Sequence, residues 1–214
     1  MLFLNAHTHD KGSIKDLSIL QTEDEKHLRW NSVGIHPWYS ESYTLKDVVP
    51  YFEHWSTDFT IAVGEAGVDA LRGGDLVHQY DLFVEQARLA EELQLPLIIH
   101  CVRSWEWILK AYKALEPTQM WIYHGFSKKN LLSSVLNCEK IMISIGASVL
   151  STNRDNTWIR EIPDHRLLLE TDNANVDINS IYEIVSMTKA ISLQDLQKQI
   201  DTNFKKTFTK WHIG

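Results

Sequence analysis

Short apolar segments recur along the chain, and most of them end at a polar residue. Hydrophobic and polar positions do not alternate within them, which is typical of parallel strands that are buried on both faces. We therefore predict a strand at each of seven places. They are LFLNAH (2–7), NSVGIH (31–36), TIAVGEAG (60–67), PLIIHC (96–101), MWIYHG (120–125), KIMISIG (140–146) and RLLLETD (166–172).

Amphipathic stretches lie between several of these strands, with apolar residues near helical spacing and charged residues between them. In the stretch 104–115, the pattern places Trp105, Leu109 and Tyr112 on one face. Alternating strands and helices predict an α/β fold with a parallel sheet. The predicted helices occupy 80–93, 104–115 and 179–191.

An eighth strand is harder to find, and IKDLSILQT (14–22) is the only candidate. Few residues separate it from His9, whereas a parallel crossover needs about a dozen or more. We therefore predict a shortened (β/α)8 TIM-type barrel that lacks its first crossover helix. Thr22 and Glu25 have the spacing of a capping box, which predicts a short helix after the second strand. Residues 1–214 are predicted to form a single domain.

Composition and charge limit the possible classes of protein. Hydrophobic residues make up 44% of the 214 positions and charged residues 23%, as in globular proteins. No apolar segment approaches the ~20 residues of a membrane span, and the N-terminus lacks the basic start of a signal peptide. With two cysteines, a disulfide framework is not expected, so we predict a cytoplasmic protein without a membrane partner. The net charge of −7 argues against broad adsorption to nucleic acid.

Histidines and carboxylates gather at the carboxyl ends of the predicted strands. In a barrel these ends converge on one rim, where the active site is built. A single such histidine is more often a half-buried imidazole bonded to a carbonyl, but the joint placement of several favours a metal site. The residues are His7, His9, His36, Glu65, His100, His124, Glu170 and Asp172.

Imidazole and carboxylate ligands suit zinc or manganese and, with more retained water, magnesium. Because the residues are too many for one tetrahedral ion, we predict two divalent ions. His7, His9 and Asp172 are assigned to one ion, and His100 and His124 to the other. Glu65 is predicted to bridge the pair. A water between the ions would be the nucleophile, and Asp172 is placed to accept its proton.

Six motifs in this order resemble those of the TatD-like metal-dependent hydrolases, a family of the amidohydrolase superfamily. They are NAHTHD, GIHP, AVGEAGVD, LPLIIHC, YHGFS and LLLETD. The resemblance extends from residue 1 to about residue 173. It implies a metal-dependent hydrolase and, as in several members, deoxyribonuclease activity. Carried over motif by motif, it implies the metal ligands His7, His9, Glu65, His100, His124 and Asp172.

The sequence departs from the family pattern near the substrate rather than at the ligands. The family commonly has Arg two positions after the IIH histidine, where this chain has Val102 followed by Arg103. After Asp172 the chain continues Asn173-Ala174-Asn175 instead of Ala-Pro-Tyr. Relative to the family pattern, the first helix and part of the C-terminal region are expected to be shortened. The substrate therefore does not follow from the resemblance.

Further residues at the rim have supporting roles, and for several of them the sequence leaves two roles open. His36 contacts substrate or orients a loop, and Asp69 supports a site histidine or caps the next loop. Glu170 is expected to orient a ligand rather than to bind metal. Arg103 could contact phosphate oxygens, and Trp38 either stacks on a base or lines the pocket wall.

The sequence thus predicts a metal-dependent hydrolase, most plausibly a phosphodiesterase or deoxyribonuclease that acts on a small substrate or on single-stranded DNA ends. Two alternatives stay open. One is a hydrolase of another ester, an amide or a lactone; a lysine-bridged amidase or lactonase is disfavoured because no predicted strand ends in Lys. The other is a metal-binding barrel that has lost turnover, against which the spare bridging position argues.

Overall fold

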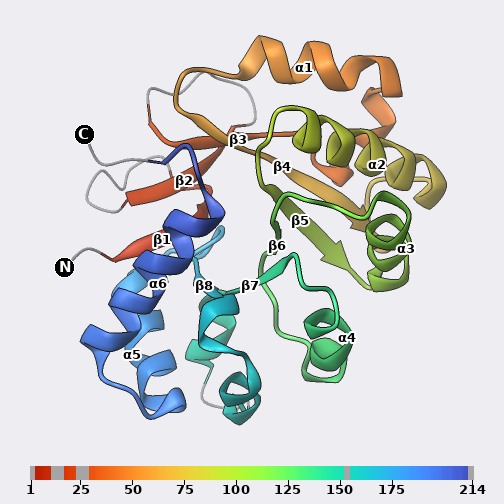
Figure 1. Ribbon diagram of the computed structural model, residues 1–214. Coiled ribbons are helices and arrows are strands. Elements are labelled where there is room, and N and C mark those ends of the chain that lie inside the picture. The colour runs from red at the N-terminus through yellow and green to blue at the C-terminus, as the bar shows by residue number, and fades with distance from the viewer. Residues whose placement is uncertain (1–2, 11–16, 23–28, 152–154, 212–214) are drawn as a thin grey trace. The chain divides into compact units, whose positions relative to one another are not determined.

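The computed structural model describes residues 3–10, 17–22, 29–151 and 155–211 (Figure 1). Contacts divide the chain into two compact units. The first unit comprises residues 1–20 and 124–214, and the second comprises residues 21–123. The single domain over 1–214 stays a prediction.

In the first unit, the residues that the structure describes form parallel strands and three α-helices. β1 pairs in parallel with β2, with Leu4 opposite Leu17, and β7 pairs in parallel with β8. A further parallel bridge joins Thr8 to Asp172, beyond the end of β8. The elements are β1 (Leu4–Thr8), β2 (Leu17–Thr22, of which the last two residues belong to the second unit), α4 (Leu132–Leu136), β7 (Ile141–Ile145), β8 (Leu167–Leu169), α5 (Ile178–Lys189) and α6 (Leu193–Thr207).

Helices α5 and α6 pack against the strands of this unit. The Tyr182 hydroxyl of α5 donates to the Leu4 carbonyl at 2.9 Å and accepts from the Leu4 N–H at 3.1 Å. Because Tyr182 is fully buried, these bonds fix the start of β1 against α5. They position the strand that carries His7 and that ends one residue before His9.

The described residues of the second unit form four complete strands, besides the end of β2, and three α-helices. β3 pairs with β4, β4 with β5, and β5 with β6, all in parallel. Helices α2 and α3 pack on β4 and β5, as Figure 1 shows. The elements are β3 (Asn31–Val33), α1 (Val48–Trp55), β4 (Thr60–Asp69), α2 (Leu76–Glu92), β5 (Leu97–Val102), α3 (Trp105–Leu115) and β6 (Trp121–Tyr123).

The strands agree with the prediction from the apolar segments. All ten residues of β4 are buried, as are all of β1 and β7, which explains why these segments lack alternation. β2 confirms the eighth strand within 14–22. The missing crossover helix and the helix after Thr22 fall on residues 11–16 and 23–28, which lie outside the described residues.

Helix α3 buries a wider face than the three predicted residues form. Helix α3 buries Trp105, as expected, but its other fully buried residues are Ile108 and Ala111 rather than Leu109 and Tyr112. Leu109 and Tyr112 are half-buried, and the Tyr112 ring contacts the buried Trp121 ring of β6 with 5.5 Å between the centroids. Among the described residues, no helix combines the length and apolar character that a membrane span needs.

Buried glutamines of α2 hold the loops that follow β3 and β4. Gln86 accepts a hydrogen bond from the Ile35 N–H at 2.6 Å and donates to the Ile35 carbonyl at 3.1 Å. Gln79 accepts from the Asp69 N–H at 2.8 Å. Helix α2 thereby orients both His36 and Asp69, which sequence reasoning placed at the rim.

Candidate metal centre

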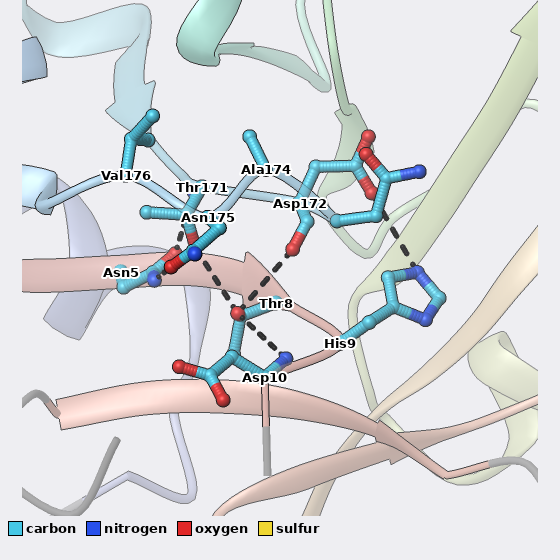
Figure 2. A pocket seen from close by; sticks show the side chains of 10 residues that line it. Asn5, Thr8, His9, Asp10, Thr171, Asp172, Ala174, Asn175 and Val176 are labelled. Carbon is cyan, nitrogen blue, oxygen red and sulfur yellow. Dashed lines mark hydrogen bonds and ion pairs between the residues drawn. The ribbon is translucent and has the colours of Figure 1, made fainter. Parts of the chain in front are cut away.

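In the first unit, His7, His9 and Asp172 form one cluster of possible metal ligands. One ligand atom of each lies within 4.8 Å of the others. The Nε2 atoms of His7 and His9 are 3.7 Å and 3.6 Å from Asp172 Oδ1. Figure 2 shows the Asp172 and His9 side chains turned toward one another at the edge of a pocket.

The backbone holds this cluster together. The Asp172 N–H donates to the His7 carbonyl at 3.0 Å, and the His9 N–H donates to the Asp172 carbonyl at 3.1 Å. Asp172 has a φ of 54°, in the left-handed region that aspartate and asparagine tolerate better than most residues. The position of the carboxylate therefore follows from the backbone as well as from its side chain.

His124 and Glu170 lie beside this cluster. The rings of His7 and His124 have centroids 4.8 Å apart, and His124 Nδ1 is 3.4 Å from Glu170 Oε1. Burial alone would raise the pKa of Glu170, but its hydrogen bond and charge interaction with His124 outweigh burial and lower the pKa below the usual value. Glu170 also accepts a hydrogen bond from the Gly125 N–H, so it contacts both His124 and the residue that follows it.

The pocket in Figure 2 has a volume of about 300 Å³ and borders His9 and Asp172. Asn173, Ala174 and Asn175 line it, and these are residues at which the sequence departs from the family pattern. Behind them, Asn5 donates to Thr171 Oγ1 at 2.8 Å and accepts from the Thr171 N–H at 3.1 Å. The altered loop therefore forms a polar wall beside the cluster.

In the second unit, His36, Glu65 and His100 form another cluster whose ligand atoms lie within 4.8 Å of one another. Glu65 Oε1 is 2.5 Å from His100 Nδ1 and 3.4 Å from His36 Nε2. All three residues are buried. His36, which the sequence placed only near substrate, is thus part of the same group of side chains as two predicted ligands.

Asp69 lies on the far side of the His100 ring. Its Oδ2 is 3.0 Å from His100 Nε2 and accepts from the Trp38 indole N–H at 2.6 Å, while Oδ1 accepts from the Leu71 N–H at 2.8 Å. Burial raises the pKa of Asp69, but the hydrogen bonds from His100 and Trp38 outweigh it and lower the pKa to about 2. Asp69 therefore both contacts a site histidine and caps the next loop.

Asp69 is expected to control metal affinity through His100. A carboxylate at Nε2 favours the tautomer that leaves Nδ1 available on the Glu65 side. Asp69→Asn should weaken Zn²⁺ binding about 10- to 100-fold, measured by titration calorimetry on metal-free protein. Asp81→Asn, an exposed change on α2, is the matched control. Equal affinity in Asp69→Asn and wild type would contradict this role.

Gln21 is a residue that sequence reasoning missed. Its Oε1 accepts from the Glu65 N–H at 2.6 Å and from the Ser32 hydroxyl at 2.9 Å. Gln79 and Gln86 were missed as well. The signal for those two was available, because they lie seven positions apart on the core-facing side of α2, where a polar residue needs a buried partner.

Arg103 lies outside both clusters. It follows β5, is exposed and has a φ of 51°. Within the part of the chain that the structure describes, its guanidinium forms no hydrogen bond or ion pair. The side chain is therefore available to a ligand.

Both clusters fit divalent metal ions by their donor chemistry. Each combines imidazole nitrogens with a carboxylate oxygen, the set that zinc and manganese accept. In each, partners outside the cluster orient a ligand: Asp69 orients His100, and backbone bonds orient Asp172. Such support is usual around protein metal sites.

The TatD related DNase family matches residues 5–209 of the chain. The chain belongs to this family. Among curated relatives, it is 28% identical over 149 residues to the 3'-5' ssDNA/RNA exonuclease TatD of Erwinia amylovora and 30% identical over 150 residues to that of Erwinia tasmaniensis. Each match covers 67% of this chain and 57% of the relative.

Other relatives extend the same similarity. The human 3'-5' RNA nuclease TATDN2 is 27% identical over 153 residues, which cover 68% of this chain and 20% of that protein. The crystal structure of the TatD homolog YjjV from Escherichia coli has a TM-score of 0.81 and 19% identity, and the match covers 97% of this chain and 98% of the other. A TatD family hydrolase from Entamoeba histolytica has a TM-score of 0.78 and 16% identity, with 99% of each chain covered.

These structures confirm the predicted fold class. The chain is a TatD-type (β/α)8 barrel with eight parallel strands. The family predicted from the six motifs is confirmed as well.

Proposed function

We propose that this TatD family member is a metal-dependent nuclease that hydrolyses phosphodiester bonds at the ends of single-stranded nucleic acid. The observation that carries the proposal is the presence of two imidazole–carboxylate clusters, one in each unit, in a chain of this family. The relatives named as exonucleases of single-stranded DNA or RNA support the choice of substrate.

The proposed metal ligands are those predicted from the sequence, namely His7, His9, Glu65, His100, His124 and Asp172. Two divalent ions, zinc, manganese or magnesium, are proposed, with Glu65 as the ligand common to both. The close contacts of Asp172 with His7 and His9, and of Glu65 with His100, support this set. His36 and Glu170 are proposed to orient Glu65 and His124.

When bound, the ions would neutralise phosphoryl oxygens and lower the pKa of a bound water to about 7. Asp172 is proposed to accept the proton of the attacking water. Its side chain is 32% exposed and borders the pocket, so a substrate can reach it. Arg103 is proposed to contact a phosphate oxygen, because its guanidinium is exposed and offers paired N–H donors.

A panel of substrates tests the proposal. Protein stripped of metal with a chelator and then supplied with Mn²⁺, Zn²⁺ or Mg²⁺ is given a labelled single-stranded DNA, a small phosphodiester, an amide and a lactone. We expect nucleotide release only in added metal, with little cleavage of amide or lactone. Cleavage of amide or lactone without nucleotide release would overturn the nuclease proposal and leave a hydrolase of another bond.

A further inference from the structure

The loops after β3 and β4 present four exposed side chains beside the second cluster. We call Trp38, Tyr39, Leu71 and Arg72 the rim platform. Trp38 is 40% exposed, Tyr39 51% and Leu71 60%. The Arg72 guanidinium lies over the Trp38 ring, 4.4 Å from its centroid. Large apolar side chains this exposed need a reason when they gather next to a functional site.

The rim platform is rigidly built. The Ser40 hydroxyl donates to the Gly73 carbonyl, and buried Gln79 donates to the Arg72 carbonyl at 2.8 Å. Gly73 has a φ of 84°, and a Cβ there would lie 2.0 Å from the Pro37 carbonyl oxygen. The two loops thus approach too closely for a side chain at Gly73. Trp38 and Arg72 are positioned before any ligand arrives.

The platform is also joined to the candidate metal centre. The Trp38 indole N–H donates to the same Asp69 oxygen that contacts His100 Nε2. The Trp38 backbone N–H donates to His36 Nδ1 at 3.1 Å, and the two rings have centroids 4.8 Å apart. A ligand that rests on Trp38 is therefore one residue away from His100 and His36.

We propose that the Trp38–Arg72 pair stacks an unpaired nucleobase next to the scissile phosphate. The inference rests on the proposed nuclease function and deepens it. Indole and guanidinium planes both stack on bases without reading their sequence. Arg72 forms no ion pair with another described residue. Although the protein carries a net charge of −7, the positive charge of this guanidinium is therefore available to the phosphate next to the stacked base. Bases inside a duplex have both faces covered by neighbouring bases. The Trp38–Arg72 pair should therefore bind single-stranded ends in preference to duplex.

Binding measurements test the stacking without requiring hydrolysis. The probe is a fluorescent phosphorothioate-linked pentathymidylate, compared with the same strand carrying abasic terminal nucleotides, both in Mn²⁺. For Trp38→Leu we expect the Kd for the base-bearing strand to rise about tenfold, at the lower end of measured stacking contributions. Trp38→Phe keeps a ring but loses the N–H, and should stay within about threefold. Arg72→Gln should also weaken binding.

For the abasic strand, wild type and Trp38→Leu should have about the same Kd, and this Kd should be close to that of Trp38→Leu for the base-bearing strand. Trp107→Leu, on α3, is the matched tryptophan control, and thermal melts check that each variant is folded. Equal weakening on both strands would show that Trp38 acts only through Asp69, and no weakening on either would show that no base rests there. Either result overturns the inference. Nucleotide release without this base dependence would support the nuclease proposal and overturn the stacking inference. Base-dependent binding without nucleotide release would support the stacking inference and overturn the nuclease proposal.

Discussion

Glu65→Gln is expected to lower kcat/KM for nucleotide release by about a thousandfold or more, since the metal centre supplies several kcal/mol of charge stabilisation. Glu65 is 1% exposed and contacts both His36 and His100. Glutamine has nearly the same shape but no negative charge. His100 and His36 would then face a neutral amide, and the ligand proposed for both ions would be lost.

Glu53→Gln is the matched control for this change. Glu53 lies on α1 of the same unit and is exposed, so its substitution should leave release and metal content unchanged. Metal content of the two variants is measured by elemental analysis after reloading. Activity of Glu65→Gln within threefold of wild type would contradict the proposed role of Glu65.

Asp172→Asn is expected to reduce kcat by about 10²- to 10⁴-fold, the usual effect of losing a group that transfers a proton in the transition state. Asparagine accepts a φ near 54° as readily as aspartate, and the backbone bonds to His7 and His9 do not involve the side chain. The variant should therefore fold normally. Its thermal unfolding should lie close to that of wild type.

Steady-state nucleotide release from a labelled single strand checks this prediction. Asp58→Asn, an exposed substitution in the turn before β4, serves as the control. A kcat for Asp172→Asn equal to that of wild type would contradict the proton-acceptor role, even if the substrate is correct. A kcat that saturating Mn²⁺ restores to the wild-type value would instead assign Asp172 to ligation alone.

The strands and the residues at their ends were predictable because parallel strands buried on both faces leave an unmistakable pattern. The spacing of His7 and His9 predicted that their side chains lie together, and their ring centroids are 5.1 Å apart at the end of β1. Asp172 could be placed at the carboxyl end of a strand because it closely follows the apolar segment LLL. Local sequence carries this information because strand burial and side-chain alternation are local properties.

The partners of these residues were not predictable in the same way. Gln21 reaches the Glu65 N–H across 44 positions, and Asp69 reaches His100 across 31. Such pairings depend on strand register, which no local pattern specifies. The two readings of Asp69 stayed open for this reason, and the structure shows that the carboxylate makes both kinds of contact.

The substrate is the part that sequence leaves most open. Asn173 and Asn175 line the pocket beside His9, where the chain departs from its family, and Trp38 and Arg72 lie beside His100. These positions tolerate many side chains without loss of the fold, because they are in loops rather than in the buried strands. The missing first crossover helix also stays a prediction.

If the proposed function is correct, nucleotide release depends on bound metal, and a single titration measures this dependence. Metal-free wild-type protein is titrated with Mn²⁺ while bound metal and nucleotide release from a labelled single strand are recorded in the same samples. We expect no release without metal, release that rises with metal occupancy, and a plateau at two bound ions per chain. Full release in excess chelator, or full occupancy with no release, would contradict it.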